Sequence, residues 1–250
     1  MTGLTPAAGE NPAARPAPPQ RIAVVIPAKD EAARIGPTVE AARTVPGVDL
    51  VVVVDDGSRD ATAVLAARAG ADVVRHRHNR GKAAALATGA RRVQILDLEQ
   101  DLPRRGLLFV DADLGPTAAA TAVLTEAVLD GRADMTIAVL GRQRTPGSGH
   151  GFVVGLARRG IVRATGWTPA QPLSGMRCLT PQAFEAALPL ARGWGVETAL
   201  TIDLLTAGFR IEEVPCDLQH RVTGSDWSGQ LHRAAQFRDV AAALVVRSVR

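Results

Sequence analysis

Short apolar runs alternate with longer alanine-rich stretches between residues 21 and 141. The runs have the length and β-branched content of buried strands, and the stretches have the length and composition of helices. The predicted strands lie in IAVVIP, LVVVVDD, ADVVRH, GLLFVDAD and ADMTIAVLG. Strands that alternate with helices in this way predict an α/β fold, with a mainly parallel sheet and helices on both of its faces.

Proline, aspartate and glycine mark the expected ends of these helices. Pro37 and Pro116 suit the first turn of a helix, and Asp60 can cap the helix that follows it. Gly70 and Gly131 suit helix ends, because glycine readily adopts the left-handed conformation of a C-terminal cap. In such a sheet the binding crevice lies at the carboxyl ends of the strands, so the residues at those ends decide the function.

The alternation breaks after Gly141. The segments that follow are a Gly-rich basic loop GRQRTPGSGHG, a basic helix FVVGLARRGIVRATG, a mixed stretch PLSGMRCL, a helix around VETALTIDLLTAG, a strand RIEEVPCDL and a last helix from about Gly229. We expect this half, residues 141–250, to build a lid and a second-substrate site on the sheet that residues 21–140 begin.

The domain plan follows from these patterns. Residues 1–20 are rich in Pro and Ala and lack both an apolar signal core and any periodicity, which predicts a disordered tail rather than a signal peptide. Residues 21–250 are expected to form a single domain. No stretch approaches the roughly 20 apolar residues of a membrane span, and the two cysteines form no CxxC pair. A cytoplasmic protein fits both observations.

Composition narrows the class of partner. The formal net charge is +4, yet acidic residues are interspersed and no long basic run occurs, which favours weak attraction to phosphates. Aromatic residues make up 3% of the chain and Tyr is absent, so a protein that stacks nucleic-acid bases on aromatic rings is disfavoured. Of the 29 basic residues, only Lys29 and Lys82 are lysines.

Acidic residues follow three of the predicted strands. They are Asp30 and Glu31, Asp55 and Asp56, and Asp111 and Asp113. Like charges crowded at one edge of a sheet repel unless a cation or hydrogen-bond donors compensate. Carboxylates at i and i+2 of an extended segment face one side, so Asp111 and Asp113 can bind one divalent ion, Mg2+ or Mn2+. The alternative is that each cluster caps a turn, with Asp55 to Ser58 accepting amides of the next helix.

Gly81-Lys82 opens the helix after the third predicted strand. The segment is not a Walker A loop, because the earlier Gly is absent and Ala83 stands where Ser or Thr should follow Lys. A Gly-Lys pair at a helix N-terminus can still bind a diphosphate through backbone amides and the ammonium charge. The alternative is a solvated lysine on the helix surface.

The histidines and serines show no recognisable catalytic spacing. Neither HExxH nor a paired metal spacing occurs, and no serine lies in a GxSxG elbow. We therefore expect most histidines to be ordinary surface or hydrogen-bonded residues; they are His76, His78, His150, His220 and His232.

Four segments of the first half carry a family resemblance. Taken in order, IPAKDEAARI, VVVVDDGSRDAT, NRGKAAAL and FVDADLG resemble the nucleotide-sugar-binding half of GT-A fold (Rossmann-like) glycosyltransferases of family 2. The resemblance covers about residues 21 to 115. It implies a donor site of Pro27, Asp30 and Glu31 around the nucleoside, Asp56 at the base, Lys82 at the diphosphate, and the DxD pair Asp111 and Asp113 at ribose and metal. Asp30 stands where the family more usually has Asn.

The second half is similar, more narrowly, to the polyprenyl-phosphate hexose synthases and the glucosyl-3-phosphoglycerate synthases. The segments that carry this likeness are Gly141-Arg142, LSGMR from Leu173, GVE from Gly195, VP from Val214 and HRVTG from His220. In both groups the acceptor is a phosphate compound. The resemblance implies that the acceptor is bound by Arg142, Ser174, Arg177 and Arg221, and arginine is well suited to clamp a phosphate.

These resemblances imply a metal-dependent glycosyltransferase that moves a hexose from a nucleotide sugar to a phosphate-bearing acceptor such as a polyprenyl phosphate or 3-phosphoglycerate. A UDP-sugar is favoured over a GDP-sugar as the donor. The ion at Asp113 would neutralise the departing nucleoside diphosphate. A phosphate acceptor needs no strong base, whereas a hydroxyl acceptor would, and Glu197 is the candidate. His220 is either a further metal ligand, as in some soluble relatives, or a structural histidine.

Other functions stay open on the sequence. A nucleotidyltransferase that makes a sugar nucleotide has a similar sheet, although PAKDEAARIG matches its Gly-rich, Arg-containing loop poorly. A non-catalytic regulator would bind a nucleotide sugar without consuming it. The last helix, LHRAAQFRDVAAALVVRSVR, has an apolar face and arginines that permit peripheral docking on a membrane, although packing on the domain is favoured.

Overall fold

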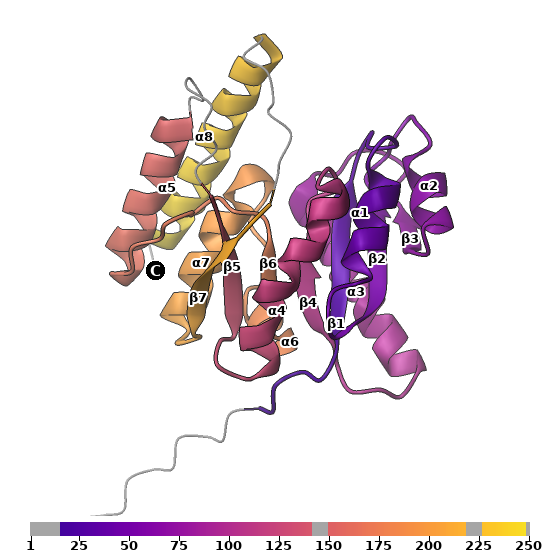
Figure 1. Ribbon diagram of the computed structural model, residues 1–250. Helices are drawn as coiled ribbons and strands as arrows, with labels where there is room; N and C mark the ends of the chain where they lie inside the picture. Colours follow the sequence, from indigo (N-terminus) through magenta and orange to yellow (C-terminus); the bar gives the residue numbers. More distant parts are fainter. Residues whose placement is uncertain (1–15, 142–149, 219–226, 249–250) are drawn as a thin grey trace, which may run out of the picture.

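A seven-stranded sheet forms the centre of the molecule, with the strand order β3-β2-β1-β4-β6-β5-β7 (Figure 1). The computed structural model describes residues 16–141, 150–218 and 227–248. The strands are β1 (Ile22–Ala28), β2 (Val48–Asp55), β3 (Asp72–Arg75), β4 (Gly106–Phe109), β5 (Met135–Leu140), β6 (Arg177–Leu179) and β7 (Ile211–Cys216). Strand β6 runs antiparallel to its neighbours β4 and β5, and the other neighbouring pairs are parallel. The prediction of a mainly parallel sheet is confirmed.

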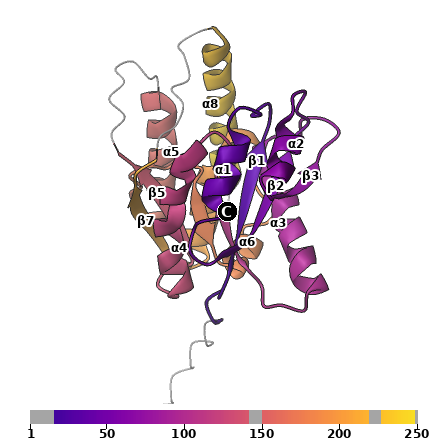
Figure 2. The ribbon, with the colours of Figure 1, turned by 45° about the vertical axis from the view of Figure 1, so that its right-hand side comes forward.

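Helices cover both faces of this sheet. On one face lie α1 (Ile35–Ala42), α2 (Thr62–Arg68), the 3-10 helix η1 (Gly115–Thr121) and α4 (Ala122–Leu129), and on the other lie α3 (Lys82–Glu99), α6 (Pro181–Ala186) and α7 (Val196–Thr206). The helices α5 (His150–Thr165) and α8 (Trp227–Ser248) pack on each other and on α7, and α8 also contacts η2 (Gly193–Gly195). Figure 2 shows α5 and α8 toward the upper end of the molecule. The predicted α/β class, with helices on both faces, is confirmed.

Strand β1 explains why the predicted strands are continuous apolar runs. Ile22, Val24 and Ile26 pack toward α1 and α4, while Ala23 and Val25 pack toward α3. All five side chains are fully buried. Successive side chains of a strand point to opposite faces, and helices cover both faces here, so no alternation with polar residues remains.

The sequence did not predict β6 or α6. Strand β6 has three residues, too few for an apolar period to be visible. Helix α6 has six residues and depends on local capping, because the Thr180 hydroxyl accepts the N–H of Ala183 at 3.2 Å and Pro181 occupies its first turn. Strand β6 is important for the architecture, because it lies between β4 and β5.

The predicted helix ends agree with the structure, with one difference. Gly70 and Gly131 have φ angles of 93° and 68°, just after α2 and α4. The Asp60 carboxylate accepts the N–H of Thr62, the first residue of α2, at 3.0 Å. Pro116 lies at the start of η1, so the stretch after it begins as a 3-10 helix before it continues as α4.

The last helix packs on the domain, as the sequence favoured. Val240 of α8 is buried against Val153 and Ala157 of α5. Arg247 Nε also donates to Asp203 Oδ1 of α7, at 2.8 Å. No helix among the described residues combines the length and the apolarity needed to cross a membrane. The tail predicted for residues 1–20 lies largely outside the described residues, which begin at residue 16.

Candidate active site

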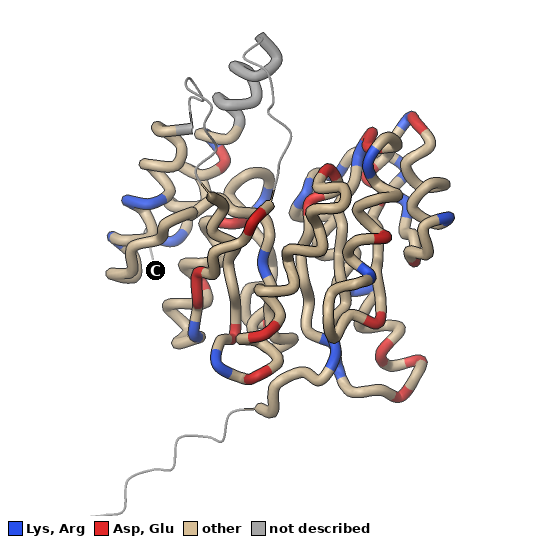
Figure 3. The backbone as a smooth tube through the Cα atoms, in the orientation of Figure 1, with Lys and Arg blue, Asp and Glu red and all other residues tan. Residues whose placement is uncertain are grey.

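Three polar segments meet at one edge of the sheet. They follow β1, β2 and β4, which are neighbouring parallel strands, so their carboxyl ends point the same way. We call this edge the acidic edge, and define it by residues 29–31, 55–58 and 111–113. Figure 3 shows acidic and basic positions together at this upper end of the strands. The sheet therefore brings together the acidic residues that the sequence placed after separate strands.

Lys82 links the acidic edge to the second half of the chain. It is the first residue of α3, and its Nζ lies 2.9 Å from Asp111 Oδ1 and 3.2 Å from Glu197 Oε1 in the first turn of α7. Burial alone would lower the pKa of the Lys82 ammonium, but the charges of Asp111 and Glu197 outweigh burial and raise the pKa. The side chain is 23% exposed. Lys82 is therefore a charged group within the site and not a solvated surface lysine.

The turn before β6 passes directly over this ion pair. A Cβ atom on Gly175 would lie 2.4 Å from Lys82 Nζ and 3.2 Å from both carboxylate oxygens of Asp111, so a larger residue would displace one of them. The neighbouring Ser174 is buried, and its Oγ has no hydrogen-bond partner within the described part of the chain. The Ser174-Gly175 turn thus forms one wall of the site, and the Ser174 hydroxyl is buried within that wall.

Arg177 lies beneath this turn, in the core, and not on an acceptor-facing surface. Its side chain is fully buried, and its Nε donates to Ser174 O at 2.8 Å while one terminal nitrogen donates to Thr201 Oγ1 at 2.9 Å. Burial lowers the pKa of its guanidinium to about 10, although Glu197 and Glu213 act in the opposite direction. The direct phosphate contact expected for Arg177 is therefore replaced by a supporting role, because the turn carbonyls need a donor inside the core.

Asp56 holds the loop that precedes Lys82. Its Oδ1 accepts the N–H of Arg80 at 2.8 Å and faces His76 Nδ1 at 2.7 Å, and its Oδ2 accepts the N–H of Gly81 at 2.8 Å. Burial would raise the pKa of the Asp56 carboxyl, but these three hydrogen bonds outweigh burial and lower it. The Gly81 amide, one of the groups expected to bind a diphosphate, is therefore already bonded to Asp56. The Lys82 ammonium and the amides of the first turn of α3 are the other groups of that expected contact.

The loops after β1 and β2 are joined through Asp30. Its N–H donates to Ser58 Oγ at 2.9 Å, and its Oδ1 accepts the N–H of Arg59 at 2.8 Å. The hydrogen bond from Arg59, together with Lys29 at 3.0 Å, lowers the pKa of the Asp30 carboxyl. Asp30 has a φ of 56°, a conformation that Asn and Asp tolerate best among non-glycine residues, so Asp can stand where the family usually has Asn. In the alternative interpretation of this cluster the Ser58 hydroxyl caps the next helix; in the structure it accepts the N–H of Asp30.

Glu31 and Pro27 lie in the same joined region. The N–H of Glu31 donates to Thr62 Oγ1 at 2.8 Å, and the N–H of Ala32 donates to Asp60 Oδ2 at 3.0 Å. Pro27 is half-buried near the end of β1, opposite Val54 of β2. Side chains from the β2 loop thus fix the backbone of the β1 loop, which gives the proposed nucleoside side of the site a set shape.

The Asp111-Ala112-Asp113 segment is held in place from α1. The buried Thr38 hydroxyl donates to Ala112 O at 2.9 Å and accepts the N–H of Gly115 at 2.8 Å. Ala112 is buried, whereas Asp111 and Asp113 are half-buried. The two carboxylates are thus carried by a segment whose backbone is anchored. Nothing in the sequence pointed to Thr38, because the contact joins residues more than 70 positions apart.

The donor atoms of this segment suit a hard divalent cation. Asp111 and Asp113 offer the carboxylate oxygens that Mg2+ and Mn2+ prefer. Among the side chains that the structure describes, no three His, Cys, Asp or Glu residues gather into a larger ligand group. The pair therefore fits an ion that takes its other ligands from phosphate oxygens and water, as Mg2+ commonly does. Three expected residues, Arg142, His220 and Arg221, lie outside the described residues.

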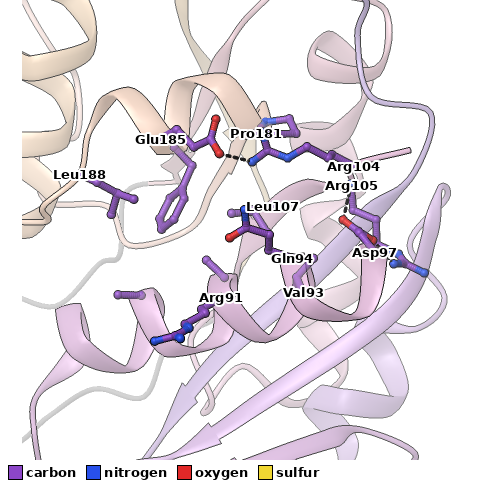
Figure 4. Close-up of a pocket in the computed structure, with 13 residues that line it drawn as sticks. Arg91, Val93, Gln94, Asp97, Arg104, Arg105, Leu107, Pro181, Glu185 and Leu188 are labelled. Atoms are coloured by element: carbon purple, nitrogen blue, oxygen red, sulfur yellow. Dashed lines mark hydrogen bonds and ion pairs between the residues drawn. The ribbon is translucent and has the colours of Figure 1, made fainter. Parts of the chain in front are cut away.

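A separate cavity of about 270 Å³ lies between α3 and α6 (Figure 4). Its lining includes Val93, Leu107 and Phe184, and the rim carries an ion pair in which Arg104 lies 2.7 Å from Glu185. Leu107 is near the start of β4, whereas the acidic edge follows the end of that strand. The cavity therefore lies away from the acidic edge, and we do not assign the donor or the acceptor to it.

Solved structures of an enzyme share the fold of this chain. The fold is similar to that of glucosyl-3-phosphoglycerate synthase from Mycobacterium tuberculosis in complex with phosphoglyceric acid, at 28% identity and a TM-score of 0.71, covering 91% of this chain and 80% of that chain. The complex of that enzyme with Mn2+, UDP and phosphoglyceric acid matches at 26% identity and a TM-score of 0.70, covering 91% and 78%. Its complex with Mg2+ and UDP matches at 27% identity and a TM-score of 0.70, covering 91% and 79%.

Sequence comparisons agree with the structural ones. An uncharacterised protein of Methanocaldococcus jannaschii is 46% identical over 68 residues, which is 27% of this chain and 28% of that relative's length. The family model for glycosyl transferase family 2 matches residues 23–148, half of the chain, and includes the whole acidic edge. The chain therefore belongs to glycosyl transferase family 2, and it is a glycosyltransferase with the GT-A fold.

Proposed function

We propose that this glycosyltransferase moves a hexose from a nucleotide sugar to a phosphate-bearing acceptor, in a reaction that depends on Mg2+ or Mn2+. A UDP-sugar is the favoured donor and a GDP-sugar the second choice. Among acceptors, 3-phosphoglycerate is preferred to a polyprenyl phosphate, because the similar solved enzyme was crystallised with phosphoglyceric acid and UDP. The observation that carries the proposal is the position of Lys82 Nζ between Asp111 and Glu197, where the two halves of the chain meet.

Donor binding follows from the acidic edge. Pro27, Asp30 and Glu31 surround the nucleoside, in loops that side-chain hydrogen bonds already fix. Asp56 meets the base, and because its pKa is lowered it is an ionised carboxylate that accepts an N–H. This chemistry suits uracil, whose ring carries such an N–H.

Lys82 supplies a permanent positive charge to the diphosphate. Its raised pKa keeps the ammonium charged at neutral pH, and Gly175 leaves it room to lie against Asp111. A charge fixed in advance stabilises a leaving group without reorganisation during the reaction. A divalent ion held by Asp111 and Asp113, when bound, would add Lewis-acid neutralisation of the same diphosphate.

The acceptor faces the Ser174-Gly175 turn. The buried Ser174 hydroxyl, which lacks a partner within the described residues, is suited to bind an acceptor oxygen, and Arg177 supports the turn from beneath. During transfer the bond from the anomeric carbon to the diphosphate breaks and a bond to the acceptor oxygen forms. An attacking phosphate is already anionic. An attacking hydroxyl loses a proton, and the nearly buried Glu197 is the candidate base.

Activity assays that combine different sugar donors with different acceptors test this proposal. We expect release of UDP from UDP-glucose with Mn2+ and 3-phosphoglycerate, a glycosylated product by mass spectrometry, and little release with a polyprenyl phosphate. Asp113→Ala should abolish the metal-dependent transfer without changing the circular dichroism spectrum, and Asp130→Ala, at an exposed position, serves as its matched control. Pyrophosphate release from UTP and glucose 1-phosphate would indicate a nucleotidyltransferase instead. Donor binding without turnover for any acceptor would indicate a regulator.

A further inference from the structure

His76 is a buried histidine that directly contacts the proposed base-binding carboxylate. It follows β3, and its ring is held between two elements: Nδ1 lies 2.7 Å from Asp56 Oδ1, and Nε2 lies 3.0 Å from Thr88 Oγ1 of α3. The residue is 7% exposed, so solvent does not compete with either contact. The sequence offered no signal for this arrangement, because no metal or catalytic spacing includes His76.

The chemistry of the two contacts determines which nitrogen of the His76 ring donates a hydrogen bond. A carboxylate accepts hydrogen bonds and cannot donate them, so the Nδ1 facing Asp56 must carry a proton. A hydroxyl can donate or accept, so Thr88 can complement Nε2 in the neutral ring. His76 therefore donates to Asp56 and is itself held in orientation by α3.

Asp56 connects His76 to the loop before Lys82 through hydrogen bonds. Its Oδ1 accepts from both His76 and Arg80, and its Oδ2 accepts from Gly81, the residue next to Lys82. A carboxylate has about four acceptor positions, and three are used by these protein donors. The remaining one is left for a ligand. The orientation of Asp56, and hence of that free position, depends on the donor at His76.

We propose that His76 is a positioning residue for the donor nucleotide: it orients Asp56 toward the base and, through Arg80 and Gly81, sets the loop that presents Lys82. This inference rests on the proposed function, in which Asp56 meets the base. Its effect falls on nucleotide affinity and base selectivity, and not on the transfer step, because His76 is separated from Asp111 and Glu197 by Asp56 and the Lys82 loop.

Two substitutions of His76 each retain one of its two contacts, to Asp56 or to Thr88. The amide nitrogen of asparagine is as many bonds from Cα as Nδ1 is, so His76→Asn can still donate to Asp56. The amide of glutamine reaches the Nε2 position, so His76→Gln favours Thr88 and loses the donor to Asp56. Thr88→Val removes only the distal contact. Thr136→Val, which deletes a buried hydroxyl of β5 that donates to Leu124 O, is the control for general destabilisation.

The measurement is calorimetric binding of UDP and CDP with Mn2+, together with steady-state kinetics and melting temperature. Uracil N3 carries a proton and cytosine N3 does not, so an aligned Asp56 should prefer UDP. We expect His76→Gln to weaken UDP binding about ten-fold and to bring the UDP to CDP affinity ratio toward one, with kcat at saturating donor nearly unchanged. His76→Asn should restore most of the affinity, and Thr136→Val should lower only the melting temperature.

The outcomes separate this inference from the proposed function. If wild-type protein binds UDP and His76→Gln binds it equally well with the same UDP to CDP ratio, the role of His76 is overturned. That role is equally overturned if all variants lose affinity only in proportion to their melting temperatures. Wild-type protein that binds neither UDP nor GDP would contradict the proposed function itself.

Discussion

Lys82 Nζ lies 3.2 Å from Glu197 Oε1, which joins the start of α3 in the first half of the chain to the first turn of α7 in the second. The same ammonium lies 2.9 Å from Asp111, so one cation serves a carboxylate of each half. The site is thus assembled by a charge contact across the sheet. Substitutions in that contact, or in the loops that present it, should therefore have separate and measurable effects.

Lys82→Arg is conservative in charge but not in shape. A planar guanidinium is larger than an ammonium, and Gly175 leaves space for Nζ alone, since even a Cβ there would approach it to 2.4 Å. We expect the KM for the donor to rise about ten-fold or more with the fold intact. The measurement is initial-rate kinetics with varied UDP-glucose. Arg92→Lys, at a surface pair with Asp72, is the reverse exchange at a distant position and should leave KM unchanged.

Gly175→Ala tests the close approach of the turn. The added methyl group would push Lys82 or Asp111 out of place, so we expect kcat/KM to fall about ten-fold or more, since catalysis depends on small displacements of charged groups. Gly36→Ala is the matched control: it lies in α1 with nothing within 4 Å of its added Cβ. Equal activity of the Gly175→Ala and Gly36→Ala enzymes would show that the turn does not confine the ion pair.

Glu197→Gln keeps the shape of the side chain and removes its charge. If an acceptor hydroxyl is deprotonated by Glu197, kcat should fall about 100-fold with 3-phosphoglycerate, whereas the dissociation constant of UDP should change little. Glu185→Gln, on α6 beside Arg104, is the control away from the acidic edge. A large loss of UDP affinity with normal kcat would instead assign Glu197 to holding Lys82.

Asp56→Asn should change the pH dependence of stability. The pKa of the Asp56 carboxyl is lowered in the folded protein, from an ordinary value of 3.8. The stability it contributes is therefore fully present above about pH 4 and is lost as the pH falls through the folded pKa. At pH 7 the substitution should cost about 2 kcal/mol of unfolding free energy, because the amide cannot accept every hydrogen bond that the carboxylate does.

Urea unfolding of wild type and Asp56→Asn at pH 7 and pH 3 makes this comparison. The gap between the two proteins should narrow at pH 3. Asp130→Asn, at an exposed position, should show no gap at either pH. A gap of equal size at both values would mean that the Asp56 charge makes no contribution to folding.

The strand order explains which parts of the site the sequence could predict. Asp30, Asp56 and Asp111 each follow an apolar strand, and parallel strands place such residues at one edge of the sheet. The local sequence pattern was therefore enough to predict that these residues lie at the same edge. The positions of Arg177 and Gly175 depend on β6, a strand too short to show an apolar period. The sequence therefore could not predict that Arg177 is buried or that Gly175 lies close to Lys82 and Asp111. His76 depends on the partners Asp56 and Thr88, which the sequence does not place together.

The position of β6 also determines how separable the two halves are. Strand β5 ends the first half at Leu140, yet both of its neighbours, β6 and β7, come from the second half. A chain cut after β5 would leave that strand with no neighbour to pair with and β4 with an open edge. We therefore expect the two halves of the chain, which share one sheet, to unfold as one cooperative unit, and we expect a new acceptor specificity to require changes in loops rather than the exchange of a module.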